Sequence, residues 1–404
     1  MPPNAPQLRK EQGRAPASNR RRVAIRLELD WPYRRHCDVY SGAQQFARDA
    51  DTWECVIDEF AEATLRRGSA KNPVYDGILA RATPALAKEA ARCRIPLVNL
   101  WYNSPVMERL PGVFASAAGM GQLAAEHLLE RGFRRFACLT GRGEKFQKIE
   151  SDAFHAVIRK AGCQCHCAVV ECQFMENEKN WDAFQRTADQ WVRAWAPPIG
   201  VFVTFPNMMG RCLADICRRR NIVVPDQAAI VASDNEPSLC LHPAPSLTCV
   251  EVTYEKVGYT AAKLLDRLMS GQTPIPRLHW IPPSGIIARQ STDFFAVEEP
   301  LVDAALRFIS SNLQQPIQVN EVCSGVFCGR RTLERRFRAA LGRSISEEIL
   351  RLRMERAKRE LASTNTSLKL IAGSVGFRDA KRMHEVFFRE LGMSPSEYRQ
   401  SMTS

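Results

Sequence analysis

The sequence lacks the features that mark a membrane or exported protein. No run of about 18 apolar residues occurs along the chain, so we expect no membrane span and no membrane partner. The N-terminal stretch, residues 1–21, is basic and has no apolar segment after its basic residues, so it does not resemble a secretory signal and is expected to be a disordered arm. These absences favour a cytoplasmic protein.

Motifs of the common cofactor enzymes are also missing. No G-x-G-x-x-G follows a predicted strand, no G-x-x-x-x-G-K-[ST] exists, and no G-x-S-x-G elbow appears. A nucleotide-cofactor enzyme or an α/β-hydrolase therefore has no support from motifs. We expect no cofactor and no catalytic residues, and an enzyme that uses an α/β cleft is the less favoured alternative.

Cysteine is plentiful, but its pattern does not indicate disulfides or zinc. The 14 cysteines are scattered through apolar segments, which is typical of small buried side chains in a reducing compartment. One group, formed by Cys163, Cys165, His166, Cys167 and Cys172, lacks the Cys-x2-Cys pair usual for zinc. Its alternating spacing is typical of a strand, so we interpret it as a strand and predict no metal.

Positive charge is concentrated at the two ends of the chain. The net charge is +12, yet residues 23–299 hold 32 basic and 32 acidic residues. Residues 1–22 contribute +5 and residues 300–404 contribute +7. Clustered positive charge binds phosphate by releasing counterions, so the distribution indicates a nucleic-acid partner. The alternative is that the basic ends only keep the chain soluble.

Two helix-turn-helix patterns follow one another near the C-terminus. The first runs from Val319 to Gly342 and the second from Leu368 to Gly392. Each has a short apolar helix, a tight turn and a second helix with basic residues on one face, which fits the major groove of DNA. A linking helix is predicted over residues 346–363, with four of its basic residues toward solvent or phosphate: Arg351, Arg353, Arg356 and Lys358.

The middle of the chain alternates strand-like and helix-like segments, which predicts βαβ units and parallel sheets. Predicted strands lie at 21–29, 54–60, 76–80, 95–100, 133–141, 199–205 and 228–235, and predicted helices include 41–50, 119–132 and 154–162. We expect two α/β lobes with a ligand cleft at the strand ends, the second lobe beginning near the loop 140–143.

Residues 22–293 resemble the sugar-sensing domain of LacI/GalR-type regulators, on the segments DGILA, GQLAAEHLLERG, VASDNE and PPSGIIARQSTD. The C-terminal region is similar to AraC/XylS-type regulators, and the segments that carry this similarity are IAGSVGF, VFFRELG and SPSEYR. The order of the two regions along the chain resembles that of xylose-operon regulators. The resemblance implies a two-lobed periplasmic-binding-protein-like α/β domain, parallel sheets flanked by helices, followed by an all-α domain with two helix-turn-helix motifs. It divides the chain into an arm (1–21), a sensing domain (22–293), a linker with a coupling helix (294–315) and a DNA-binding domain (316–404).

The resemblance also implies a function. We expect a sequence-specific transcription regulator that binds double-stranded DNA at operator half-sites, with a sugar or sugar-like effector. We further expect the protein to be a homodimer located at the nucleoid. If it is an activator, we expect RNA polymerase to be a partner. A nucleoid-type architectural protein without a ligand is another alternative.

The family pattern places two sets of residues on the groove side of the recognition helices. These are Arg330, Arg331, Glu334 and Arg335 in the first helix, and Arg378, Ala380, Lys381, Arg382 and Glu385 in the second. Arginine pairs with guanine and glutamate accepts from cytosine, although any of these arginines could instead contact phosphate only. In the first motif Phe327 and Gly329 replace the family's turn glycine and capping serine, so a strained turn is expected. The second motif keeps Gly376 and Phe377.

The resemblance names the expected ligand-binding residues as well. Those that fit a sugar cleft are Asp234 and Asn235 at the end of a predicted strand, with Trp31, Tyr33, Arg34, Trp101, Tyr102 and Asn103 in the first lobe. The aromatic residues among them could equally pack the loops. Three places depart from the family's sugar pattern, namely Ser116-Ala117 for Asp-Asn, Glu150 for Arg and Phe205 for Asp. We therefore predict altered pentose specificity, with a cationic or less polar ligand, or no ligand at all.

Overall fold

The computed structural model describes residues 20–30, 33–171, 176–204, 207–272, 276–293, 299–363 and 366–403. They form two compact units, one within residues 1–113 and 258–278 and the other within residues 114–257 and 279–404. The chain therefore passes between the units three times. No helix among the described residues is both long and apolar enough to span a bilayer.

The first unit is built on a sheet with the strand order β2-β1-β3-β4-β5 and β11 at the edge. The strands are β1 (Arg21–Arg26), β2 (Trp53–Ile57), β3 (Gly77–Ala80), β4 (Leu97–Asn99), β5 (Gly112–Ala115) and β11 (Leu278–Ile281). Pairing from β2 through β5 is parallel. Strands β3, β4 and β5 are buried along their whole length, as expected where helices cover both faces.

Helices cover this sheet: α1 (Arg34–Ala50), α2 (Ala61–Arg67), α3 (Pro84–Arg92) and α9 (Tyr254–Met269), with a short 3-10 turn at Met107–Arg109. Leu65 of α2 and Leu86 of α3 pack in one core with Ile78 of β3. Helix α9 approaches α1 closely, because a Cβ on Gly258 would lie 1.9 Å from the carbonyl oxygen of Val39. The return of the chain into the first unit thus depends on a glycine.

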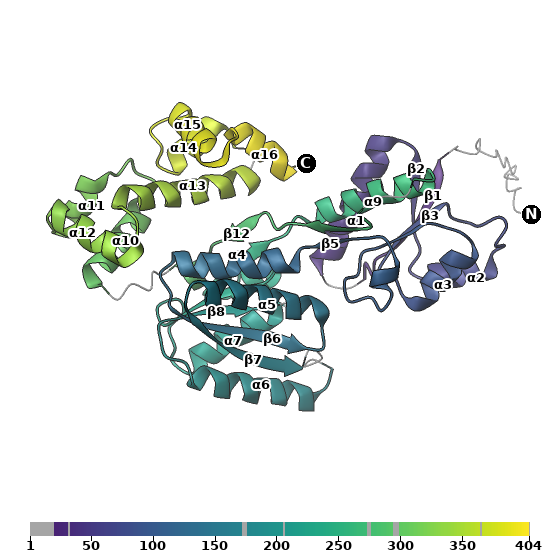
Figure 1. The fold of residues 1–404 in the computed structure, drawn as a ribbon, viewed down its shortest axis with the longest axis horizontal. Coiled ribbons are helices and arrows are strands. Elements are labelled where there is room, and N and C mark those ends of the chain that lie inside the picture. The colour runs from purple at the N-terminus through teal and green to yellow at the C-terminus, as the bar shows by residue number, and fades with distance from the viewer. Residues whose placement is uncertain are drawn as a thin grey trace, which may run out of the picture. The chain divides into compact units, whose positions relative to one another are not determined.

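The second unit repeats the same order, β7-β6-β8-β9-β10, with β12 antiparallel at the edge. Its strands are β6 (Arg135–Arg142), β7 (Gln164–Glu171), β8 (Ile199–Val203), β9 (Ala228–Ala232), β10 (Thr248–Glu251) and β12 (Gly285–Ile287). Its helices are α4 (Ala117–Glu130), α5 (Lys145–Lys160), α6 (Glu178–Arg193), α7 (Asn207–Arg219) and α8 (Pro237–Cys240), with a 3-10 turn at Gln290–Thr292. Helices α4 and α5 share one core with the sheet, and α6 and α7 share the other (Figure 1).

The predicted alternation of strands and helices is confirmed in both lobes, and so is the parallel pairing. One boundary was wrong, because the second unit begins at Phe114, ahead of α4, and not near the loop 140–143. Strand β6 continues through that stretch to Arg142. Strand β7 confirms that Cys165, His166 and Cys167 alternate within a strand, while Cys172 lies outside the described residues.

The C-terminal helices form two small cores joined by one long helix. They are α10 (Pro300–Asn312), α11 (Val319–Gly325), α12 (Arg330–Leu341), α13 (Ile345–Ser363), α14 (Leu368–Ser374), α15 (Ala380–Leu391) and α16 (Pro395–Thr403). Ile349 of α13 packs with α10, α11 and α12, whereas Leu361 packs with α14 and α15. Helix α13 runs from one group to the other (Figure 1). Because α10 supplies Leu306 and Ile309 to the first core, it belongs structurally with the first helix-turn-helix motif.

Candidate nucleic-acid interface and ligand-binding residues

Helix α12 presents a basic face because its apolar residues recur at helical spacing. Leu333 and Phe337 are fully buried in the first core, which turns the intervening positions toward solvent. Arg330, Arg331 and Arg335 are exposed, as predicted. Arg330 is paired within the helix, with its Nε 2.9 Å from Oε1 of Glu334.

Helix α15 has the same arrangement and a stronger N-terminal cap. The Asp379 side chain accepts a hydrogen bond from the backbone N–H of Arg382 at 2.7 Å. The Arg382 side chain in turn lies 3.0 Å from the Glu385 carboxylate, both at the surface. Ala380 is half-buried against the second core, so it packs inward more than the predicted groove-facing role requires.

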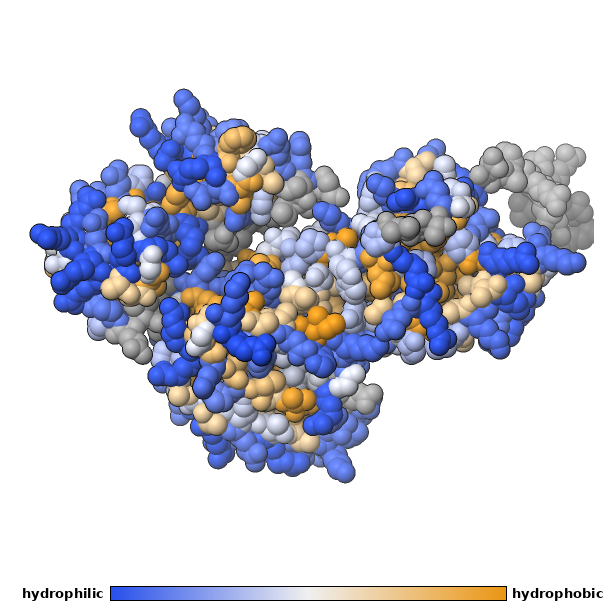
Figure 2. Space-filling model, viewed as in Figure 1, coloured by the Kyte–Doolittle hydropathy of each residue, from blue (hydrophilic) through white to orange (hydrophobic). Residues whose placement is uncertain are grey.

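Four exposed cations of the predicted set have no ion-pair partner within the part of the chain that the structure describes. They are Arg331 and Arg335 on α12, and Arg378 and Lys381 at the start of α15. Figure 2 shows the visible face of the C-terminal helices as mostly hydrophilic. An unpaired guanidinium is available for a base edge or a phosphate, whereas Arg330 and Arg382 would first have to give up a carboxylate.

A groove of about 680 Å³ links the two motifs. Arg330 of the first motif lines it, together with Arg378, Lys381 and Arg382 of the second. Helix α13 contributes Arg353 to the same lining. Most of the lining is uncharged, but its basic residues outnumber the acidic pair Asp379 and Glu385.

The turn of the first motif is strained as predicted. Phe327 has φ 51°, a left-handed conformation that costs a residue with a Cβ about 1–2 kcal/mol, and its side chain is 97% exposed. Gly329 occupies the N-cap position of α12 and, being a glycine, has no side chain that could cap the helix. In the second motif Gly376 holds the left-handed position with φ 81°.

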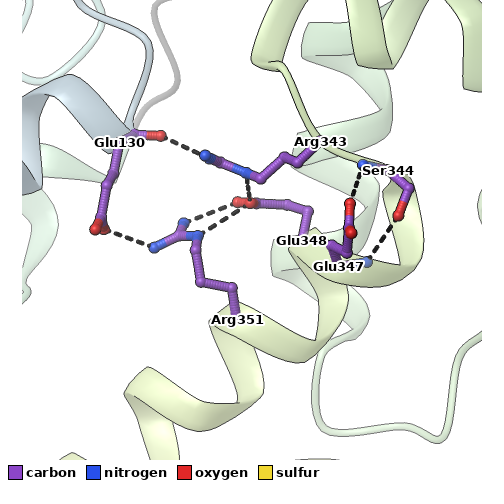
Figure 3. A network of polar contacts seen from close by, with 6 residues as sticks. All are labelled: Glu130, Arg343, Ser344, Glu347, Glu348 and Arg351. Atoms are coloured by element: carbon purple, nitrogen blue, oxygen red, sulfur yellow. Dashed lines mark hydrogen bonds and ion pairs between the residues drawn. The ribbon is translucent and has the colours of Figure 1, made fainter. Parts of the chain in front are cut away.

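Two arginines of α13 have partners inside the protein, contrary to the prediction that they face solvent or phosphate. Arg353 donates to the carbonyl oxygens of Gln315 at 2.9 Å and Ile317 at 3.1 Å, and burial lowers the pKa of its guanidinium. Arg351 donates to Glu348 at 2.8 Å and to Glu130 of α4 at 2.9 Å (Figure 3). Both therefore support the fold of the second unit.

Glu348 is the centre of this network (Figure 3). Its carboxylate is fully buried and accepts hydrogen bonds from both Arg343 and Arg351. Burial alone would raise the pKa of Glu348, but the two guanidinium groups outweigh burial, and the net pKa is lowered. Arg343 also donates to the backbone carbonyl of Glu130 at 2.9 Å, so the network connects α4 to the N-terminal part of α13.

In the first unit, the predicted ligand residues stand at the carboxyl ends of the strands. Tyr33 occupies the N-cap position of α1 without a capping hydrogen bond from its side chain, and Arg34 is paired with Asp38 at 3.2 Å. Trp101 follows β4, and the Arg81 guanidinium lies over its ring at 5.1 Å from the centroid. Trp31 lies outside the described residues.

Sequence reasoning missed an ion pair beside Trp101. Arg81 follows β3, and its Nε lies 2.8 Å from the Glu28 carboxylate, which follows β1. Burial lowers the pKa of Arg81, and burial also lowers the pKa of the nearby His36 to about 4. The position of Arg81 directly after the predicted strand 76–80 is the signal that would have identified it, whereas Glu28 fell inside the predicted strand 21–29, which in the structure ends at Arg26.

In the second unit, Asp234 and Asn235 follow β9, as predicted. The Asn235 amide donates to Glu251 at 2.7 Å and accepts from Arg289 at 2.7 Å, so both of its ends are held. The Tyr254 hydroxyl donates to the Asp234 carboxylate at 3.2 Å. Glu251 and Arg289 were not predicted, because nothing in their local sequence marks them.

The residues that depart from the family's sugar pattern have structural roles in this unit. Glu150 of α5 is fully buried and accepts a hydrogen bond from the Ser233 hydroxyl. Ser116 caps α4, accepting from the backbone N–H of Gly119 at 3.2 Å. Phe205 lies outside the described residues.

Comparison with known families agrees with this architecture. A periplasmic binding protein-like domain matches residues 125–292, and a helix-turn-helix domain matches residues 322–401. A putative AraC-like transcription regulator of Streptomyces antibioticus is 34% identical over 102 residues, 25% of this chain and 34% of that protein. The chain therefore combines a periplasmic binding protein-like domain with a helix-turn-helix domain of the AraC type, in that order.

Over nearly its whole length, the chain is homologous to xylose operon regulatory proteins. That of Escherichia coli K12 is 25% identical over 391 residues, 95% of this chain and 97% of the relative. That of Haemophilus influenzae is 29% identical over 399 residues, 94% and 98% of the two chains. The solved structure of a xylose-binding transcription activator shares the fold, with a TM-score of 0.56 at 23% identity over 95% of this chain and 98% of that one.

Proposed function

We propose that the protein recognises operator half-sites with both recognition helices and that a small polar effector controls this binding. The observation that carries the proposal is a set of four unpaired cations in a chain that also has a periplasmic-binding-protein-like domain: Arg331 and Arg335 lie on α12, Lys381 lies in the first turn of α15, and Arg378 lies just before that helix. Arg331 and Arg335 would read or grip one half-site, and Arg378 and Lys381 the next. The protein would act as a homodimer at the nucleoid, in the cytoplasm, and as an activator it would contact RNA polymerase.

The test uses the full chain and DNA from the region upstream of its own gene and neighbouring genes. Footprinting and fluorescence anisotropy should locate a site protected over successive turns of the duplex, with an affinity that falls steeply as salt rises. A footprint without sequence preference would overturn the proposal in favour of an architectural protein. Turnover of a sugar by the purified protein would favour the enzyme alternative.

We propose that the effector is a sugar-like molecule, cationic or less polar than a pentose, and that the specificity of the protein for it differs from that of a pentose sensor. Asp234 and the Glu28–Arg81 pair supply charged groups at strand ends, in the second and first units respectively. Ser116 and Glu150 are occupied with capping α4 and bonding Ser233, so neither supplies the group that the family's sugar pattern has at its position. Thermal-shift and calorimetric titrations with xylose, other pentoses and amino sugars test this, and tight pentose binding would contradict it.

The contact between α4 and α13 supports a route for control. Glu130 ends α4 of the sensing domain, and it receives hydrogen bonds from Arg343 and Arg351 of the DNA-binding part (Figure 3). We expected α10 to couple the two functions, and this network adds α13 as a second element. An effector can shift DNA binding only if the liganded and free states differ in such contacts. A regulator that binds DNA without any effector is the remaining alternative.

A further inference from the structure

Three cysteines and a histidine lie close together on one face of the second unit's sheet. Cys138 of β6 is the direct neighbour of Cys167 on the edge strand β7. Cys165 lies two residues earlier on β7 and therefore faces the same side. Helix α5 covers this face and places His155 over the cysteines.

The ligand atoms of this group are close enough to share one ion. The Sγ atoms of Cys138 and Cys167 and a ring nitrogen of His155 all lie within 4.8 Å of one another. Cys165 is not in this group of three, although its Sγ is 3.7 Å from Nε2 of His155. In a tetrahedral zinc site, bonds of about 2.3 Å to sulfur and 2.0 Å to nitrogen place the ligand atoms roughly 3.5–3.8 Å apart. Small side-chain adjustments would bring the three grouped atoms to these distances, and Cys165 would have to move closer to supply the fourth ligand.

We propose that Cys138, Cys165, Cys167 and His155 form a binding site for a thiophilic metal ion of the Zn²⁺ type. Thiolate and imidazole ligands select zinc and similar soft cations over Mg²⁺ and Ca²⁺, which need oxygen ligands. Cys167 is exposed and gives the ion an entry path, while Cys138 is buried and closes the inner side. The Ser151 hydroxyl lies 3.5 Å from the Cys138 sulfur, where it can hold the thiolate in position.

The site would have a structural consequence. Strand β7 is the outer strand of its sheet, paired with β6 alone within the described residues. A bound ion would join β7, β6 and α5 directly, and it would stabilise the folded unit because the unfolded chain does not preform the site. The sequence hid this arrangement, since Cys138 and His155 come from segments distant from the Cys165–Cys167 pair.

The experiment uses the full chain, reduced and freed of metal with a chelator, and titrated with Co²⁺ and Zn²⁺. We expect one Co²⁺ per chain, a sulfur-to-cobalt charge-transfer band in the near ultraviolet, displacement of cobalt by Zn²⁺ and a higher melting temperature. The substitutions Cys167→Ser and His155→Gln should each weaken cobalt binding by more than about tenfold. Cys163→Ser is the matched control, because Cys163 lies just before the same strand but outside the group.

Three outcomes would overturn the proposal. The first is the absence of a charge-transfer band when Co²⁺ is added. The second is a band that persists unchanged in both variants, with circular dichroism showing that the variants are folded. The third is formation of a Cys138–Cys167 disulfide under mild oxidation with no metal binding in the reduced protein, which would identify the group as a redox pair instead. Equal weakening in Cys163→Ser would show that the effect is not specific to the four residues.

Discussion

Gly376 and Leu313 lie in direct backbone contact, because a Cβ on Gly376 would be 2.1 Å from the carbonyl oxygen of Leu313. Gly376 also has φ 81°, so both space and conformation exclude a side chain. We expect Gly376→Ala to lower the free energy of unfolding by more than about 2 kcal/mol, measured by chemical denaturation.

Gly373→Ala is the matched control for that substitution. Gly373 lies in α14, and a Cβ there meets nothing within 4 Å. Alanine should stabilise the helix at this position by about 0.5–1 kcal/mol. A similar loss in both variants would show that the contact with Leu313 is not the cause.

Substitution of Phe327 by glycine should change the free energy of unfolding in the opposite direction to Gly376→Ala. Its φ of 51° strains the backbone, and its ring is 97% exposed, so replacing it loses little buried area. We expect Phe327→Gly to raise stability by about 0.5–1 kcal/mol, the relief of strain minus the entropy of a glycine in the unfolded chain. Phe327→Ala retains the strain and should give no such gain, and equal gains in thermal unfolding would contradict this explanation.

The unpaired cations should dominate DNA affinity. Arg331→Ala and Arg378→Ala are each expected to cost about 1–3 kcal/mol in binding to the specific site if they contact base edges. A phosphate contact would instead weaken specific and non-specific DNA alike and reduce the salt slope by about one. Fluorescence anisotropy at several salt concentrations separates the two roles.

Arg389→Ala is the control for these variants. Arg389 lies in the last turn of α15, and its guanidinium is 2.7 Å from the Glu390 carboxylate. The Arg389→Ala variant should bind DNA with an affinity within about twofold of that of the unaltered protein, since a surface ion pair contributes little. A loss as large as that of Arg378→Ala would place the interface elsewhere on the helix.

Glu130 should matter for control more than for stability. Its carboxylate is 48% exposed and bonds Arg351, so Glu130→Gln should change the free energy of unfolding by less than about 1 kcal/mol. DNA binding without effector should remain, while the change produced by the effector should shrink. Anisotropy titrations with and without effector measure this, and an unchanged response would exclude the α4–α13 contact as the route.

Glu348 should make the protein sensitive to acid. Its pKa in the folded chain lies below the ordinary value of 4.5, so the stabilisation is fully present above about pH 4.5 and is lost as pH falls through the folded value. Glu348→Gln removes the charge between Arg343 and Arg351 and should cost about 3–5 kcal/mol at neutral pH. Below pH 4.5 the difference between the variant and the unaltered protein should shrink, as thermal unfolding across pH would show. Glu347→Gln, at an exposed position, is the comparison and should have a much smaller effect.

Strand and helix positions could be predicted because they follow local periodicity. Buried strands such as β8 and β9 read as continuous apolar runs, and Leu333 and Phe337 mark the inner side of α12. The partners of charged side chains could not be predicted. The sequence around Arg353 is typical of an exposed helical arginine. Its hydrogen bonds to the carbonyl oxygens of Gln315 and Ile317 depend on tertiary packing, which local sequence does not reveal.

Helix α13, shared by both C-terminal cores, also fixes a length. Its 19 residues span roughly 28 Å, somewhat less than the 34 Å of one turn of B-DNA. One continuous helix connects the two helix-turn-helix motifs. The distance between the predicted recognition helices α12 and α15, and their relative rotation, are therefore set by this helix and not by a flexible linker. An operator with one base pair inserted between its two half-sites would turn the second half-site away by about a tenth of a helical turn. The protein would then have to bend that DNA or give up one of its two contacts.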